Sequence, residues 1–263
     1  MSDALLIRRE GAVLVLSNNN PAARNALSPA FYAAVTTALA EAAADASVGA
    51  VVLTGEGGHF CAGGDLRQLA RRRELPVEQR REKLEGLHDL IRAVRDCPKP
   101  VIAAVEGAAA GAGLSLALAC DMLVAARDSL FSVAYVKVGL TPDGGATAFL
   151  AEFVSRQVLT ELCLTGERIS GERMHALGPV NRLAEPGQAL ADAVALAAQI
   201  ATGPDQATAL IKDLCRQAPR NTLEQQLELE AQHMVRSQGS EESREGIAAF
   251  LEKRSADFSK LRA

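Results

Sequence analysis

Two glycine-rich segments, residues 57–65 and residues 106–115, most strongly constrain the fold. Each follows a short apolar run, residues 50–54 and residues 101–105, that predicts a buried strand, and each leads into a helical pattern. In the second segment, a loop over residues 107–113 is predicted to lead into a helix over residues 114–119. Glycine permits positive φ and close approach of a ligand, and a helix N-terminus offers unpaired N–H groups with partial positive charge. Two such ends facing one oxygen would form an oxyanion hole. Each segment alone is equally compatible with a tight turn between strand and helix.

Other glycine-loop chemistries fit the second segment less well. A dinucleotide-binding fingerprint would use Gly111 and Gly113, but Leu116 occupies the place of its third glycine. The lysine of a phosphate-binding P-loop is absent, and Ser115 does not lie in the G-x-S-x-G pattern of a serine hydrolase. The segment therefore gives little support to a nucleotide-binding loop or to a serine nucleophile.

The first part of the chain predicts an α/β fold with a largely parallel sheet, because strands alternate with helices. Ser28 is a suitable N-cap and Pro29 suits the first helical position, which predicts a helix over residues 30–44. A second helical stretch, residues 67–95, is broken once by Pro76. The predicted strands are residues 12–17, 50–54, 101–105 and 122–126.

The character of the chain changes after about residue 187. Beyond that point, Ala-rich or amphipathic segments separated by polar breaks predict helices over residues 189–201, 204–217, 223–237 and 240–253. We therefore expect a core with the active site over residues 1–187 and a helical C-terminal region over residues 188–263.

Composition narrows the functional class. Of the 263 residues, 48% are hydrophobic, which permits a substantial core, and the net charge of −4 supplies no basic surface for nucleic acid. The five cysteines are scattered without a C-x-x-C pair, which favours a reducing cytoplasm over a disulfide framework or a zinc site. No signal-peptide pattern is evident at the start, and charged and glycine residues interrupt the most apolar stretch, residues 101–126. We expect a cytoplasmic protein without metal, membrane span or nucleic-acid partner.

Five motifs, in this order and spacing, resemble those of the crotonase (enoyl-CoA hydratase/isomerase) superfamily. They are R-N-A-L at residues 24–27, F-C-A-G-G-D at residues 60–65, K-P-V-I-A-A-V-E-G at residues 99–107, G-A-G at residues 111–113 and A-C-D at residues 119–121. The similarity runs from about residue 5 to F-L-E-K-R at residues 250–254, so it covers nearly the whole chain.

The resemblance implies a crotonase-like spiral of ββα units, with a helical C-terminal region that forms trimers, often paired into hexamers. It implies that the backbone N–H groups of Gly64 and Ala112 bind a thioester oxygen, and that the CoA portion contacts Arg24, Ala62 and Gly64. Lys253 resembles a C-terminal lysine that reaches the ligand of a neighbouring subunit. The expected partners are an acyl-CoA substrate and further copies of this chain, with no cofactor beyond the CoA of the substrate.

The chain departs from the pattern of the family's hydratases at two positions. Those enzymes add water with two glutamates, and the corresponding positions here are Ser115 and Tyr135. Adding water to an alkene requires the removal of one proton and the delivery of another, which groups with tuned pKa values perform. Neither serine nor tyrosine replaces a carboxylate well near neutral pH. The departure argues against hydration by the two-glutamate route.

Asp143, His88 and Tyr135 are the candidate side chains for proton transfer. Some members of the family place a functional aspartate at the position of Asp143; the alternative is an N-cap for a helix that begins at Gly144. The resemblance to the family's dehalogenases extends to a histidine base at the position of His88, and imidazole titrates near working pH. The alternative for His88 is a helix histidine with a local partner. Tyr135 either lines the acyl pocket as a hydrogen-bond donor or only packs.

Several other residues have mainly structural interpretations. Asp65 is expected to cap a helix, Asp121 to be a buried structural carboxylate, and Cys61 to contribute its backbone rather than a reactive thiol. The arginine run at residues 71–73 either adds positive field at the CoA entrance or forms a solvated helix face. Three histidines are too far apart to predict a metal site: His59, His175 and His233.

These features favour one activity and leave others open. The sequence around Asp143 is most similar to phenylacetate-type isomerases and to alternative oxepin-CoA hydrolases. The leading hypothesis is therefore isomerisation or ring opening of an unsaturated or aromatic-derived acyl-CoA. In it, Gly64 and Ala112 stabilise an enolate, Asp143 carries a proton, and His88 or Tyr135 assists. The alternatives are hydration of a 2-enoyl-CoA by groups other than glutamate, dehalogenation, and non-catalytic acyl-CoA binding.

Overall fold

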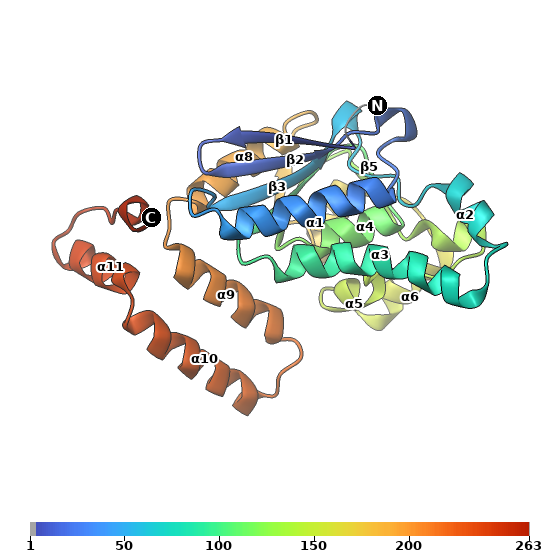
Figure 1. Ribbon diagram of the computed structural model, residues 1–263. Helices are drawn as coiled ribbons and strands as arrows, with labels where there is room; N and C mark the ends of the chain where they lie inside the picture. The colour runs from blue at the N-terminus through green and yellow to red at the C-terminus, as the bar shows by residue number, and fades with distance from the viewer. Residues whose placement is uncertain (1–3, 263) are drawn as a thin grey trace.

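A six-stranded sheet lies at the centre of the computed structural model, which describes residues 4–262. β1 and β2 form an antiparallel pair, and each later neighbour pairs in parallel. The expected mixed α/β fold with a largely parallel sheet is confirmed (Figure 1). In spatial order, the strands are β1 (Leu5–Glu10), β2 (Val13–Asn18), β3 (Ala50–Gly55), β4 (Val101–Val105), β6 (Met122–Ala126) and β9 (Arg182–Ala184).

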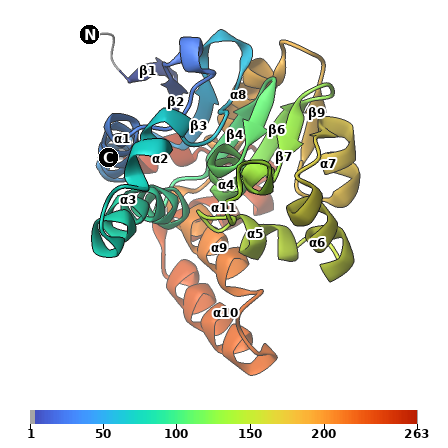
Figure 2. The same cartoon turned by 90° about the vertical axis from the view of Figure 1, so that its right-hand side faces the viewer.

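Helices cover both faces of this sheet (Figures 1 and 2). In β3, Val51 and Leu53 face one core, which also holds α1, α3 and α4, whereas Ala50 and Val52 face a second core beneath α8. Because both faces of β3, β4 and β6 are buried, these strands are continuous apolar runs, and this made them recognisable in the sequence. The covering helices are α1 (Pro29–Ala44), α3 (Val77–Asp96), α4 (Ala112–Ala119) and α8 (Ala189–Ile200).

A small second sheet contains the second glycine-rich segment. β5 (Ala108–Ala110) pairs in parallel with β7 (Leu130–Ser132), and β7 pairs antiparallel with β8 (Ile169–Ser170). The sequence predicted a loop over residues 107–113, so the strand β5 is a correction. Strands this short show no periodicity and form only where a neighbour supplies hydrogen-bond partners. α4 then begins at Ala112, two residues before the predicted start.

The remaining elements of the core are short and irregularly placed. Pro76 separates α2 from α3, as predicted, and Ser28 caps α1 by accepting the N–H of Phe31 at 3.2 Å. A 3₁₀ segment, Ala134–Val138, contains Tyr135. The other helices of this part are α2 (Leu66–Arg72), α5 (Ala146–Ala151), α6 (Arg156–Thr165) and α7 (Gly171–Leu177).

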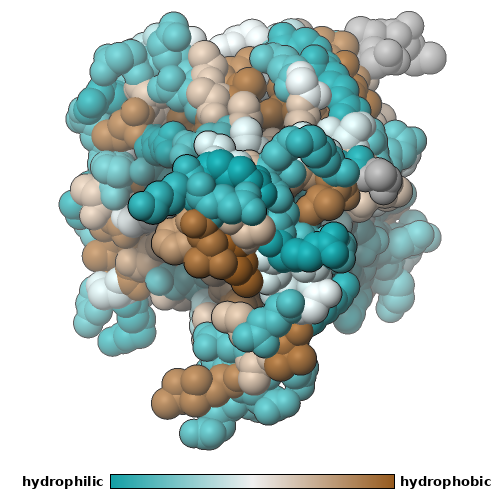
Figure 3. Space-filling view, turned by 90° about the vertical axis from the view of Figure 1, so that its left-hand side faces the viewer, coloured by the Kyte–Doolittle hydropathy of each residue, from teal (hydrophilic) through white to brown (hydrophobic). Residues whose placement is uncertain are grey.

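The C-terminal helices α9 (Asp205–Gln217), α10 (Leu223–Gln238) and α11 (Glu241–Leu251) extend away from the sheet (Figure 1). α8 packs on the sheet instead, although the sequence groups it with these helices. Hydrophobic side chains appear among hydrophilic ones at this end of the molecule (Figure 3). No helix of the described residues is long and apolar enough to cross a bilayer. The exposed large apolar residues of α9–α11 are Ile211, Leu223, Leu227, Met234, Val235, Ile247, Phe250 and Leu251.

Candidate active site

The two glycine-rich segments lie side by side and are joined by main-chain hydrogen bonds. Cys61 N donates to Ala108 O at 2.9 Å, and Ala110 N donates to Cys61 O at 3.0 Å. Gly113 permits this contact, since a Cβ on it would lie 2.4 Å from Cys61 O. Gly63, in the first segment, also permits the contact, since a Cβ on it would lie 2.7 Å from Ala110 O. The two loops therefore meet through a close backbone approach that larger residues would prevent.

Two backbone N–H groups remain free where the segments meet. Ala112 is the first residue of α4, so its N–H has no acceptor within the helix. Leu27 N donates to Gly63 O at 2.8 Å in a parallel bridge to Gly64, which turns the N–H of Gly64 away from Leu27. Among residues 4–262, neither N–H donates to a protein acceptor. A Cβ on Gly63 would lie 3.5 Å from Ala112 N, so the residue before Gly64 lies against the start of α4.

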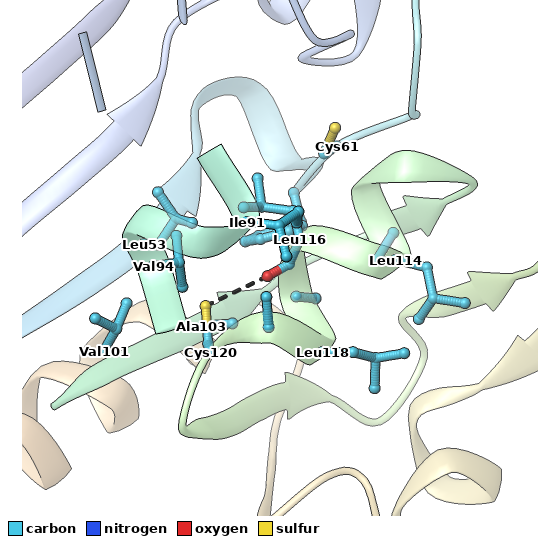
Figure 4. Close-up of a cluster of buried hydrophobic side chains, with 14 of the residues drawn as sticks. Leu53, Cys61, Ile91, Val94, Val101, Ala103, Leu114, Leu116, Leu118 and Cys120 are labelled. Atoms are coloured by element: carbon cyan, nitrogen blue, oxygen red, sulfur yellow. Dashed lines mark hydrogen bonds between the residues drawn. The ribbon is translucent and has the colours of Figure 1, made fainter. Parts of the chain in front are cut away.

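α4 holds the second of these N–H groups in a fixed place. All 8 residues of the helix are buried, and a helix that is apolar on every side belongs to a core. Figure 4 shows Leu114, Leu116 and Leu118 within the buried cluster, where Cys120 Sγ donates to Leu116 O at 3.5 Å. The N–H of Ala112 therefore belongs to a helix that the core surrounds along its whole length.

Ser115, Tyr135 and Asp143 form a hydrogen-bonded group one helical turn from Ala112. Tyr135 Oη donates to Asp143 Oδ1 at 2.6 Å, and Ser115 Oγ donates to the main-chain oxygen of Asp143 at 2.8 Å. Ser115 Oγ and Tyr135 Oη are 3.2 Å apart. Both side chains are buried. The two positions that lack the hydratase glutamates thus both bond to Asp143, Tyr135 at its carboxylate and Ser115 at its main-chain oxygen.

The surroundings raise the pKa of Asp143 above its ordinary value. Burial is the largest cause, and it is opposed by the hydrogen bond from Tyr135 and by the charges of His88 and Arg72. Burial also raises the pKa of Tyr135, as does the nearby charge of Asp143. The phenol therefore stays protonated and acts as a hydrogen-bond donor. A carboxylate in such an environment is a stronger base than an exposed aspartate.

The structural alternative for Asp143, an N-cap, is wrong. α5 begins at Ala146, and its N-cap is Gly145, which has a φ of 86° and makes no side-chain cap hydrogen bond. Gly144 also has a positive φ, of 60°. Two consecutive left-handed residues therefore separate Asp143 from the helix, and its carboxylate turns toward Tyr135 instead.

His88 lies on α3, and both interpretations of it agree with the structure. Its Nδ1 is 3.6 Å from Glu85 Oε1, a local partner, and its charge also acts on Asp143. Tyr32 of α1 and Arg72 of α2 lie close enough to interact as well: burial raises the pKa of Tyr32 to about 12, while the charge of Arg72 lowers it and that of Asp143 raises it. Neither was predicted to act on Asp143. Tyr32 belongs to no local motif, and Arg72 was considered only within the arginine run, where it differs from its exposed neighbours in being half-buried.

The residues expected to contact CoA lie at two ends of the molecule. Ala62 N donates to Arg24 O at 2.9 Å, which places both residues beside Gly64, and both are exposed. Lys253 follows α11, which lies at the opposite end of the molecule from α2 in Figure 1. A single chain therefore does not bring Lys253 to the other three, and the predicted contact requires a neighbouring subunit.

Asp65 and Cys61 have the structural roles that the sequence predicted, whereas Asp121 is not the buried carboxylate that was expected, since its side chain is 24% exposed. Asp65 caps α2 by accepting the N–H of Arg67 at 2.8 Å. Asp121 pairs with Lys212 Nζ at 2.7 Å, beside a cavity of about 440 Å³ at the other end of α4 from Ala112. Burial raises the pKa of the Cys61 thiol to about 12, so it carries no thiolate near neutral pH. In the part of the chain that is described, no three His, Cys, Asp or Glu side chains gather as a metal site would require.

Known proteins resemble this chain over almost its whole length. Residues 8–261 match the family described as enoyl-CoA hydratase/isomerase. A 1,2-epoxyphenylacetyl-CoA isomerase of Escherichia coli K12 is 36% identical over 260 residues, which cover 98% of this chain and 99% of that protein. A 2,3-dehydroadipyl-CoA hydratase of the same strain is 34% identical over 258 residues, which cover 97% and 98%. The crystal structure of an enoyl-CoA hydratase from Polaromonas sp. JS666 is 48% identical, with a TM-score of 0.94 over 96% of this chain and 98% of that one.

Proposed function

This chain belongs to the enoyl-CoA hydratase/isomerase family, and on that premise we propose that it isomerises, or opens a ring of, an unsaturated or aromatic-derived acyl-CoA. It is an acyl-CoA enzyme of the hydratase/isomerase type. Within that type, its 36% identity to a 1,2-epoxyphenylacetyl-CoA isomerase supports the proposed reaction class. The proposed chemistry needs no cofactor beyond the CoA portion of the substrate.

The proposed first step removes a proton from the carbon beside the thioester. The C–H bond breaks, the proton moves to the Asp143 carboxylate, and the electron pair spreads onto the thioester oxygen. The N–H groups of Gly64 and Ala112 stabilise that enolate oxygen. Return of the proton to a different carbon moves a double bond. Ring opening follows when the enolate electrons instead break an adjacent carbon–oxygen bond, whose oxygen then takes the proton.

The observation that carries this proposal is the environment of Asp143. Among residues 4–262, its carboxylate is the only one that hydrogen-bonds to Ser115 or Tyr135, the two positions where the hydratases have glutamates. Its raised pKa suits a group that accepts a proton and later returns it. Tyr135 assists as the donor to Oδ1, and His88 assists through its charge.

Asp143→Asn tests the proposal, because it removes the base and keeps the size of the side chain. We expect turnover of a panel of 3-enoyl-, dienoyl- and epoxyphenylacetyl-CoAs to fall by about 10²–10⁴-fold. Asp65→Asn is the matched control, since it changes a carboxylate beside Gly64 that only caps α2, and asparagine caps equally well. Undiminished turnover by Asp143→Asn rules out the assigned role.

Hydration of a 2-enoyl-CoA is the second candidate, favoured by the 34% identity to a 2,3-dehydroadipyl-CoA hydratase. Asp143 would then have to activate water and protonate the alkene with help from Tyr135. Crotonyl-CoA separates the two reactions, since hydration removes its conjugated absorbance. Rapid loss of that absorbance supports hydration, whereas unchanged absorbance combined with turnover of a 3-enoyl-CoA supports isomerisation.

Assembly of several copies is part of the proposal. Lys253 of one copy would reach the CoA held by Arg24 and Ala62 of another, because these residues lie at opposite ends of a single chain. The exposed apolar side chains of α10 and α11 support a protein partner at that end. All five cysteines are free thiols, which supports the cytoplasm as the proposed compartment.

A further inference from the structure

On the basis of the proposed role of Asp143 as a base, we infer that Ser115 is a positioning residue that fixes the Asp143 carboxylate relative to the thioester-binding N–H of Ala112. Enolate formation requires both groups to act on one substrate: the N–H holds the thioester oxygen while the base takes a proton from the adjacent carbon. Ser115 is the residue that ties the helix carrying one group to the loop carrying the other.

The distances around Ser115 indicate which acceptor its hydroxyl group donates to. Its Oγ lies 2.8 Å from Asp143 O and 3.4 Å from Gly111 O, so the single hydroxyl proton goes to Asp143. Tyr135 Oη, 3.2 Å away, gives its own proton to Asp143 Oδ1 at 2.6 Å. Asp143 is therefore held twice, at its main chain by Ser115 and at its carboxylate by Tyr135.

The position of Ser115 on α4 links this contact to the oxyanion hole. Ser115 lies three residues after Ala112, so the two are neighbours on one face of the helix. The whole helix is buried, which leaves it little freedom to tilt. Because α4 stays in place, any movement of the Asp143 loop changes the position of the carboxylate relative to the N–H of Ala112.

The loop also packs closely on position 115. Gly144 has a φ of 60°, and a Cβ on it would lie 2.9 Å from the Cβ of Ser115 and 3.3 Å from its Oγ. The backbone after Asp143 therefore packs directly on the hydroxymethyl group. Position 115 therefore faces the backbone of this loop, and a longer side chain there would have to find room beside it.

Ser115→Ala tests the inference, because it deletes the hydroxyl and adds no bulk. Ser129→Ala is the matched control: Ser129 is fully buried and donates to Ala126 O at 2.6 Å, outside the Asp143 group. The measurements are kcat and KM with trans-3-hexenoyl-CoA and 1,2-epoxyphenylacetyl-CoA, and the rate of deuterium incorporation beside the thioester of butyryl-CoA in D₂O. Thermal unfolding of each variant reports the loss of stability separately.

We expect Ser115→Ala to lower kcat and the exchange rate by about 10- to 100-fold, as a misplaced reacting group does, while KM changes by less than about threefold. Ser129→Ala should match the wild type within about twofold in both rates, whatever its thermal shift. If Ser115→Ala loses no more activity than Ser129→Ala while Asp143→Asn is inactive, the positioning role is wrong and the proposed function stands. If Asp143→Asn is fully active, or the wild type neither turns over nor exchanges any probe, both fail together.

Discussion

Gly63→Ala would separate the two loops on which the candidate oxyanion hole depends. Gly63 has a φ of 98°, and a Cβ there would lie 2.7 Å from the carbonyl oxygen of Ala110 and 3.5 Å from Ala112 N. The first of these atoms belongs to the backbone of β5, which cannot rotate away as a side chain can. The methyl group therefore has to push residues 61–64 and the start of α4 apart.

The size of the effect follows from two contributions. A non-glycine residue held at such a φ costs about 1–3 kcal/mol, and the overlap with a packed backbone costs about 1–3 kcal/mol more. The free energy of unfolding should therefore fall by about 2–6 kcal/mol. Misplacing one oxyanion donor lowers kcat by about 10²–10³-fold.

Gly58→Ala is the control that introduces a similar backbone strain without pushing the two loops apart. Gly58 lies in the same segment with a φ of 79°, but a Cβ on it would meet nothing within 4 Å. It should cost about 1–3 kcal/mol of unfolding free energy from strain alone and leave kcat within about threefold of the wild type. Urea unfolding and turnover of a 3-enoyl-CoA measure the two quantities. Equal kcat values for the two variants would refute the claim that contact between the loops shapes the site.

Three further predictions concern the site, the core and the C-terminal helices. Tyr135→Phe removes a hydrogen bond that lowers the pKa of Asp143, so the acid limb of kcat/KM against pH should move to higher pH; a limb that stays in place would contradict the bond. Lys212→Met leaves the Asp121 carboxylate, 24% exposed, without its cation, and should cost about 2–4 kcal/mol in urea unfolding, less than for a fully buried pair. The double variant with Asp121→Asn should recover most of that loss. Phe250→Asp, at a residue 82% exposed, should lower the molar mass found by light scattering if α11 joins copies of the chain.

The parts of the fold that could be predicted are those whose cause is local. Ser28 and Pro29 begin α1, and Pro76 stands directly before the first residue of α3, because capping and ring geometry act within a few residues. β5, β7 and β8 were not predicted, because strands of two or three residues exist only through pairing with distant segments. β1 was missed because five of its six residues are exposed, so the alternation that marks a strand is absent.

In the candidate site, too, features with a local cause could be predicted and contacts between distant residues could not. Local signals predict free N–H donors in the two glycine-rich segments, since a segment that opens a helix leaves donors free wherever it occurs. The resemblance to the family, not the local pattern, singled out Gly64 and Ala112 among them. The hydrogen bonds among Ser115, Tyr135 and Asp143 join residues 8, 20 and 28 positions apart, and no spacing in the sequence encodes them. The resemblance to a family supplied the positions, but only the structure shows that the hydroxyl groups at two of them bond to the aspartate.

Replacing two carboxylates by two hydroxyl groups changes the kind of acid–base chemistry that the site can support. A second carboxylate beside Asp143 would repel its charge, and this repulsion would drive the pKa values of the two groups apart. One group would then act as an acid and the other as a base, as the addition of water requires. Ser115 and Tyr135 instead donate to Asp143, and Tyr135 uses one of its carboxylate oxygens. In the proposed mechanism the other oxygen is left for the substrate, and Asp143 alone both accepts and returns the proton. A shift of a double bond needs one such group beside a stabilised enolate, whereas hydration also needs a second group for water. This arrangement of Ser115, Tyr135 and Asp143 therefore supports the proposed isomerisation.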